Sequence, residues 1–208
     1  MKYLILIILS SMFLLQNCNY VTFTRHLNVN LNDSKSFSQS GAFKKIYLIN
    51  TSKIINAITE NIDSKSARIE KLEIESMKLK VSLLPNNTAS SIHNIHIRLA
   101  KGWSDNGQTL VKLDTSRIIV NQGTIYLVNA YLVLKGVGVL KTDLVKNLAT
   151  GNPEVFELEM QGFIPAGQTF MGNIALELKA TMDAVTCEKV PLGLGPSECM
   201  VIPFTIKL

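Results

Sequence analysis

The segment IEKLEIESMKLKVSLL, residues 69–84, decides the fold class of this chain. Apolar and polar residues alternate along it, as they do in a β-strand with one buried and one solvent-facing side. The alternation changes phase at Ser76, because Leu72 and Ile74 before it and Met77 and Leu79 after it have opposite parity. One extra residue in a strand exchanges its two faces, so we predict a β-bulge near Ser76.

Alternating segments of the same kind recur along the chain, and helical spacing is rare. Two short helices are predicted, at 51–62, where isoleucines recur at helical spacing, and from Thr142 to about 148, ending at Gly151. The expected fold is mainly β, an antiparallel β-sandwich of about eight or nine strands with these two helices. The other predicted strands are 45–49, 95–99, 108–113, 117–120, 124–135, 156–161, 174–180 and 201–208.

The first residues are typical of an export signal. Lys2 precedes an apolar run from Tyr3 to Leu15, and polar residues follow up to Cys18. A membrane-spanning helix needs about 20 apolar residues, so this run is too short to span and suits the apolar core of a signal peptide. An uncleaved signal anchor and a buried N-terminal strand are the alternatives. We expect residues 1–17 to be the signal peptide.

The segment from Leu15 to Cys18, with a leucine three positions before the cysteine, resembles the cleavage site of bacterial lipoproteins. Gln16 and Asn17 stand where small residues are commoner, and this variant is similar to the looser sites of spirochaetes and the Bacteroidota. The resemblance to small bacterial lipoproteins implies acyl chains, such as palmitate, on Cys18 and attachment to the cell envelope, most simply the outer membrane. Two or more chains anchor a protein stably. Secretion without lipidation is the alternative.

Residues 18–43 are rich in Asn and Ser, which predicts the lipidated cysteine followed by a polar tether. A first strand around 20–31 that pairs with the sheet is the competing interpretation, because Val21, Phe23 and Val29 are apolar. Residues 44–208 are then long enough for one β-sandwich domain with a sizeable core.

Cys187 and Cys199 remain when Cys18 is assigned to lipid. They enclose a short loop with two prolines and two glycines, and in an oxidising compartment such a pair is expected to form a disulfide. Closing this loop would stabilise the fold by about 2–3 kcal/mol. Two unpaired thiols are the alternative, and a zinc site is disfavoured because no histidine lies nearby.

Charge and motifs exclude several functions. The net charge is +5, but the basic residues are scattered, which disfavours nucleic-acid binding. Phosphate-binding loops, nucleophile elbows and zinc-protease motifs do not occur. His93 and His96 are three residues apart, which in an extended strand points them to opposite faces. We therefore expect no metal, no cofactor, no catalytic residues and no enzymatic activity.

Two loops are candidate binding sites. Residues 101–107 carry the single tryptophan, Trp103, together with Asp105 and Asn106, and exposed tryptophans are enriched at binding hot spots. Alternatively, Trp103 folds back and covers one end of the core. Residues 190–196 present Leu192 and Leu194 on the disulfide-bracketed loop, where they contact a partner or pack on their own domain.

These features predict a lipid-anchored, non-catalytic binding or scaffolding protein of the cell envelope. Its membrane contact is the lipid on Cys18, and its partner is an unidentified envelope protein or lipid. The alternative is a carrier of a hydrophobic molecule between the sheets, which requires an unfilled lumen. An envelope hydrolase is the third hypothesis and requires His93 or His96 beside Asp105 or Asp114. The carrier lumen would be lined by Leu132, Leu134, Met160 and Leu178.

Overall fold

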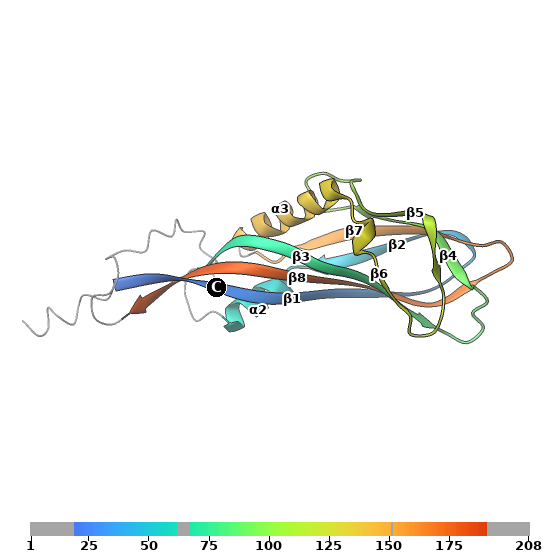
Figure 1. Ribbon diagram of the computed structural model, residues 1–208, viewed down its shortest axis with the longest axis horizontal. Helices are drawn as coiled ribbons and strands as arrows, with labels where there is room; N and C mark the ends of the chain where they lie inside the picture. Colours follow the sequence, from blue (N-terminus) through green and yellow to red (C-terminus); the bar gives the residue numbers. More distant parts are fainter. Residues whose placement is uncertain (1–18, 62–66, 151, 191–208) are drawn as a thin grey trace, which may run out of the picture.

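Two four-stranded antiparallel sheets make up the fold, which confirms the predicted mainly β sandwich (Figure 1). The computed structural model describes residues 19–61, 67–150 and 152–190. Sheet A has the strand order β1-β8-β3-β6 and sheet B the order β2-β7-β4-β5. The elements are β1 (Asn19–Gln39), β2 (Gly41–Asn50), α2 (Ser52–Asn61), β3 (Ala67–Leu83), β4 (Ser91–Leu99), β5 (Thr109–Ile119), β6 (Ile125–Leu127), the 3-10 turn η1 (Asn129–Tyr131), α3 (Leu134–Thr150), β7 (Val155–Ile164) and β8 (Phe170–Val190).

Strand β1 is the largest departure from the expected organisation. It pairs with β8 in unbroken register from Asn19 opposite Val190 to Gln39 opposite Phe170. Val29 and Leu31 are buried in the core, whereas the asparagines between and beside them face outward. The competing interpretation of this segment, an N-terminal strand, is therefore the one that the structure has. The many Asn and Ser residues occupy the wet side of a strand, and the sandwich includes residues that we had assigned to a tether.

The predicted β-bulge is confirmed. The pairing of β3 with β8 shifts between Ile74 and Ser76, and a second shift lies between Ile69 and Lys71. Next to the first shift, the Asn129 side chain replaces a backbone partner of β3. Its Oδ1 accepts a hydrogen bond from Met77 N at 2.8 Å, and its Nδ2 donates to Glu75 O at 2.9 Å. This amide satisfies backbone groups of β3 that lie just beyond the short ladder between β3 and β6.

The predicted strand over 124–135 was wrong in its length. Only β6 is extended, and the chain then turns through η1 to reach α3. The turn η1 begins at Asn129, where the β3–β6 ladder ends. There the Asn129 side-chain amide bonds to β3 in the place of a further backbone residue of β6. Helix α3 begins at Leu134, earlier than the predicted Thr142, and the predicted end at Gly151 lies outside the described residues. Gly136 and Gly138 disfavour a helix by propensity, so tertiary packing determines this start.

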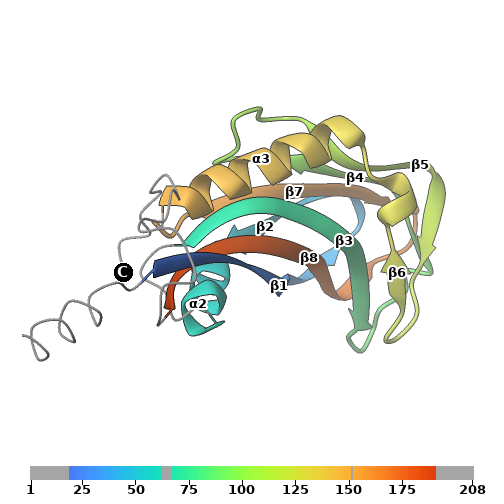
Figure 2. The same ribbon diagram turned by 60° about the vertical axis from the view of Figure 1, so that its left-hand side comes forward.

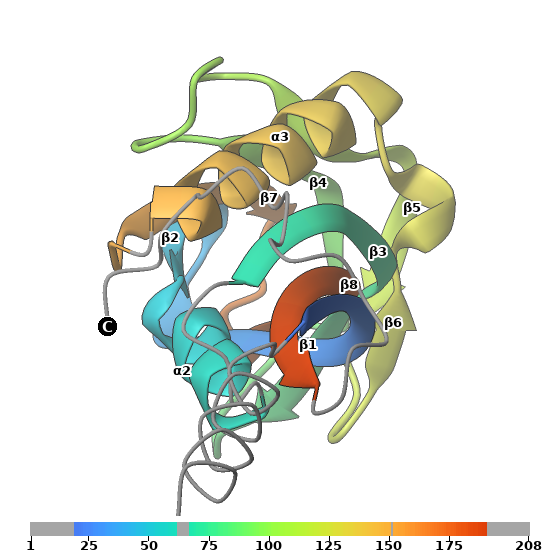
Figure 3. The same cartoon turned by 90° about the vertical axis from the view of Figure 1, so that its left-hand side faces the viewer.

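Helix α3 closes the side of the sandwich opposite the β1 and β2 edges, as Figures 2 and 3 show. It contacts β3 of sheet A together with β4 and β5 of sheet B. A Cβ atom at Gly136 would overlap the carbonyl oxygen of Thr109 on β5, so only glycine permits this close approach. The buried positions of α3 recur at helical spacing: Gly136, Leu140, Asp143, Leu144, Asn147 and Leu148.

The core lies between the two sheets, and Tyr47 links them. Its side chain on β2 is 1% exposed, and its hydroxyl donates to the carbonyl oxygen of Ile174 on β8 at 3.0 Å. Burial, reinforced by the nearby Asp33 carboxylate, raises the pKa of Tyr47 above its ordinary value, so the hydroxyl stays a donor.

The predicted helix at 51–62 is α2, and the predicted strands 108–113 and 117–120 form one strand, β5. The strand predicted for 201–208 lies outside the described residues.

Asp33 connects the free edges of the two sheets. Its Oδ2 accepts a hydrogen bond from Leu48 N on β2 at 2.7 Å, and its Oδ1 accepts one from Ser34 N at 2.8 Å. The Lys35 ammonium lies 2.9 Å from the carboxylate. Burial raises the pKa of Asp33, but the hydrogen bonds from Lys35, Leu48 and Ser34 outweigh it and hold that pKa below its usual value.

The substitution Asp33→Asn should lower the free energy of unfolding by about 1.5–3 kcal/mol at pH 7, the usual range for a hydrogen bond to a charged group. A carboxyl whose folded pKa is lowered stabilises the fold above its unfolded pKa of about 3.9, and this contribution disappears as the pH falls through the folded pKa. The difference between wild type and variant, measured by urea denaturation, should therefore shrink below about pH 4. The control Asp105→Asn removes an exposed ion pair and should cost less than about 0.5 kcal/mol. A difference for Asp33→Asn that is constant from acid to neutral pH would contradict this assignment.

Candidate functional site

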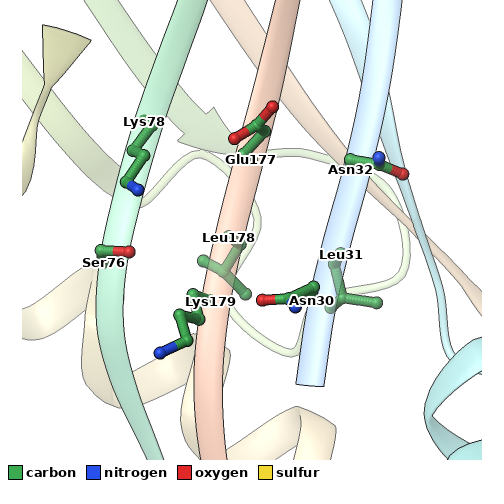
Figure 4. Close-up of a pocket in the computed structure, with 8 residues that line it drawn as sticks. All are labelled: Asn30, Leu31, Asn32, Ser76, Lys78, Glu177, Leu178 and Lys179. Atoms are coloured by element: carbon green, nitrogen blue, oxygen red, sulfur yellow. The ribbon is translucent and has the colours of Figure 1, made fainter. Parts of the chain in front are cut away.

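A polar groove lies on the outward face of sheet A, over its three longest strands (Figure 4). Its volume is about 310 Å³. Two cross-strand rows form it, because Asn32 and Lys78 both pair with Glu177, and Asn30 and Ser76 both pair with Lys179. The polar groove is defined by Asn30 and Asn32 on β1, Ser76 and Lys78 on β3, and Glu177 and Lys179 on β8, with the buried Leu31 and Leu178 beneath.

The β-bulge in β3 gives the groove one of its walls. Leu72 is buried before the bulge, and Met77 and Leu79 are buried after it, so the parity of the strand is reversed. This reversal turns Ser76 and Lys78 outward beside Lys179 and Glu177. Without the extra residue, these polar side chains would face the core.

The groove offers both hydrogen-bond donors and acceptors to solvent. Lys179 forms an ion pair with Glu75, whose carboxylate lies 2.5 Å away. Among the described residues, the side chains of Lys78 and Glu177 have no ion-pair partner within 4.0 Å. A cation, an anion, two amides and a hydroxyl thus face one hollow, which suits a polar partner that carries charges of both signs.

Lys71 and Glu73, nearer the start of β3, are already paired. The Lys141 ammonium on α3 lies 2.5 Å from the Glu73 carboxylate, and that of Lys71 lies 3.8 Å from it. The hydrogen bond from Lys141 lowers the pKa of Glu73. The pair of Lys141 with Glu73 joins α3 to sheet A, and all three of these charged side chains have an ion-pair partner, unlike Lys78 and Glu177 of the groove.

Trp103 covers one end of the core. It is 4% exposed, its ring lies 4.4 Å from the Phe156 ring, and its Nε1 donates to the carbonyl oxygen of Glu157 at 2.7 Å. The structure therefore has the alternative in which Trp103 folds back. Its indole is not exposed to a partner, although the loop around it stays accessible.

The other predicted loop residues lie around Trp103 or outside the described chain. Asp105 forms an ion pair with Lys135 at 3.4 Å. The Asn106 amide, oriented with its nitrogen toward the carbonyls, donates to Trp103 O at 3.0 Å and thereby closes the turn. The backbone of Cys187 pairs with Thr22 in sheet A. The predicted disulfide and lipid stay predictions, because Cys18, Leu192, Leu194 and Cys199 lie outside the described residues.

His93 and His96 lie on the same outward face of sheet B, contrary to expectation. A register shift at Asn94, whose φ is 50°, adds a residue between them, so that His93 pairs with Phe163 and His96 with Gln161. His93 Nε2 lies 2.9 Å from Ser91 Oγ. A bulge that the sequence pattern did not indicate thus reverses the predicted orientation.

His96 also contacts Asp114, a pair that the hydrolase hypothesis required. Lys112 bonds to the same carboxylate at 2.7 Å, and Lys112 and then His96 lower the pKa of Asp114. The described residues that line the hollow beside His96 include no serine, threonine or cysteine. No group of three metal-ligating side chains occurs among the described residues. The pair therefore lacks a nucleophile and a metal site in the part of the chain that the structure describes.

The residues predicted to line a carrier lumen do not share one environment. Leu134 is 87% exposed, whereas Met160 and Leu178 are buried. A cavity bordered by Tyr47 and Leu158 between the sheets measures about 10 Å³, too small for an organic ligand. The side chains from the two sheets fill the space between them.

No protein-family model and no curated protein matches this chain. Among solved structures, a decameric BFDV capsid protein is 13% identical with a TM-score of 0.36, covering 78% of this chain and 99% of that one. The infectious bursal disease virus Gt strain gives 14% identity and a TM-score of 0.29, and the chain covers 86% of its own length but only 39% of that chain. The extra small virus particle of the giant freshwater prawn Macrobrachium rosenbergii gives 12% identity and a TM-score of 0.25, covering 77% and 79%. TM-scores this far below 0.5 do not establish a common fold.

Sequence alternation predicted two of the three strands that form the groove, 69–84 and 174–180, and missed the third. The phase change at Ser76 predicted the bulge that turns Ser76 and Lys78 outward. Asn30 and Asn32 were assigned to a tether, so the opposite wall was not recognised. The alternation of Val29 and Leu31 with asparagines was the available signal.

Among the described residues, no helix has the length and apolar character of a membrane span.

Proposed function

We propose that this chain is a non-catalytic binding or scaffolding protein of the cell envelope, anchored by lipid on Cys18, and that the polar groove contacts its partner. The observation that carries the proposal is the set of groove side chains that have no partner among the described residues. Asn30, Ser76, Lys78 and Glu177 form no side-chain hydrogen bond or ion pair with the described residues. Such groups on a sheet face are free to bind a partner.

The position of the groove supports a binding role. Its side chains project from three adjacent strands whose other faces are packed into the core through Leu31, Leu79 and Leu178. Side chains on packed strands have a fixed spacing, so little backbone entropy is lost when a partner binds. The small volume and polar lining favour contact with a surface or headgroup over enclosure of a drug-sized apolar ligand.

The chemistry of the groove favours a partner that carries both charges. Lys78 attracts an anion, and Glu177 on the neighbouring strand attracts a cation. Asn30 and Ser76 supply neutral donors and acceptors beside them. The polar surface of an envelope protein or a zwitterionic lipid headgroup has this chemistry.

The start of β1 determines how a lipid anchor would position the domain. Asn19, the residue after Cys18, is already paired with Val190 in sheet A. A lipid on Cys18 is therefore attached directly to the end of the β1–β8 pair, and the groove lies farther along the same strands. This arrangement holds the groove at a fixed distance from the membrane rather than on a long flexible segment.

Mass spectrometry of the protein extracted from membranes should show an N-terminal peptide that begins at Cys18 and carries two or three acyl chains. The substitution Cys18→Ser should abolish the acyl mass, because the Cys18 thiol is the group that would carry the first acyl-glycerol. An unmodified N-terminus at Asn19 or upstream of Cys18 in wild-type protein would disprove the anchor.

A photoreactive residue at Thr181, beside the groove on β8, should crosslink the partner in intact cells. The double substitution of Lys78 and Glu177 by Ser should reduce the crosslinked adduct at least about tenfold, since both charged contacts are lost. The matched control replaces Lys112 and Glu157 by Ser, which removes the same charges from the outward face of sheet B. Both variants should melt within about 4 °C of wild type, as expected for surface changes. An adduct yield that the groove variant leaves unchanged, or that the control lowers equally, argues against the groove.

A further inference from the structure

A second hollow, which we call the α3 pocket, lies where the loop 101–107 meets the last turns of α3. Its volume is about 320 Å³. It lies outside the polar groove and shares no residue with it. The residues that matter for its chemistry are Ser104 of the loop, Asp143, Lys146 and Asn147 of α3, and Glu154 before β7.

Asn147 is the unusual residue of the α3 pocket. Its side chain is 5% exposed, and its Nδ2 donates to the carbonyl oxygen of Asn152 at 3.2 Å. That bond fixes the orientation of the amide. The Oδ1 atom is fully buried and accepts no hydrogen bond within the described chain. A buried acceptor without a donor costs folding free energy, so its retention in a pocket wall points to a ligand that donates a hydrogen bond.

Asp143 lies one helical turn before Asn147, on the same face of α3. It is 7% exposed, and its Oδ2 accepts a hydrogen bond from Ser104 N at 2.7 Å. No ion-pair partner of this carboxylate occurs among the described residues. The carboxylate therefore adds a negative charge next to the Asn147 acceptor. Glu154 adds a second carboxylate to the lining and Lys146 adds one ammonium, so the lining carries one net negative charge.

The wall opposite the helix is held in place by Trp103. Its ring packs on Phe156, and its Nε1 bonds to Glu157 O. The neighbouring Gly102 has a φ of 96°, and a Cβ atom there would press on the Phe156 ring at 3.1 Å. The loop is thus fixed by an aromatic contact and by backbone geometry that requires glycine. This gives the pocket a preformed shape.

We propose that the α3 pocket binds the ammonium or guanidinium group of an organic ligand, with Asn147 Oδ1 and the Asp143 carboxylate as acceptors. An organic cation supplies both the N–H donor that Asn147 lacks and the charge that Asp143 lacks. A metal ion is disfavoured because the described residues provide no group of three ligating side chains. The proposal is independent of the polar groove and of the lipid anchor.

The test is an NMR titration of the ¹⁵N-labelled protein at pH 7 with ethylammonium or methylguanidinium chloride, which separates the two donor groups. The amide of Ser104, the side-chain amide of Asn147 and the indole N–H of Trp103 should shift and saturate together. Tetramethylammonium chloride is the matched control, because it has the same charge but no N–H donor, and it should produce no saturable shift. Equal saturable shifts with tetramethylammonium would overturn the proposal, as would the absence of saturation with both N–H cations.

Substitutions separate the site from general electrostatics. Asp143→Asn should weaken binding of the better probe about tenfold, and Glu154→Gln, which changes an exposed side chain, should weaken it about threefold. Asp105→Asn removes the same charge from the nearby loop and should leave the affinity unchanged. Trp103 fluorescence checks that each variant is folded. Equal weakening by Asp105→Asn would overturn the proposal. Binding that appears only in Lys146→Gln would also overturn it, because the Lys146 ammonium would then occupy the α3 pocket in the wild-type protein.

Discussion

The pairing of β1 with β8 is the constraint on which the rest of the structure depends. One continuous antiparallel register joins the two strands along the whole of both. Its inward residues, such as Val29, Leu31 and Leu178, build one wall of the core, and its outward residues build most of the polar groove. Asp33, on the same strand, also connects β1 to sheet B, because its carboxylate accepts a hydrogen bond from Leu48 N. If β1 were a tether, both the core wall and the groove would be lost.

A bulge in β3 adapts the third strand to this pair. It lets the apolar residues before and after Ser76 face the core while Ser76 and Lys78 face the groove. On the other side of β3, the Asn129 side-chain amide bonds to the strand where its short ladder with β6 ends. The irregularity therefore fits the strand to both sides of the sheet and is a feature of the site.

Sequence periodicity predicted the elements that follow from the pattern of neighbouring residues. It failed where contacts between residues far apart in the sequence determine the structure. The alternation in 69–84 correctly indicated a long strand with a bulge, and the isoleucines indicated α2. The start of α3 was missed because Gly136 is present for its contact with Thr109, not for helix propensity. The orientation of His93 depended on a bulge with no pattern of its own. The α3 pocket was not foreseen, since Asn147 and Ser104 approach one another only in the folded chain.

Amide hydrogen exchange in β1 tests the central claim most directly. Alternate amides between Leu27 and Phe37 should exchange as slowly as their partners in β8, because each lies in the interstrand ladder. The measurement uses the full chain at neutral pH and compares these amides with those of β7 at the centre of sheet B. Slow exchange in β1 would support a sandwich whose core and groove both rest on this strand. Exchange of the whole segment at unstructured rates, with β7 still protected, would contradict it and restore the tether.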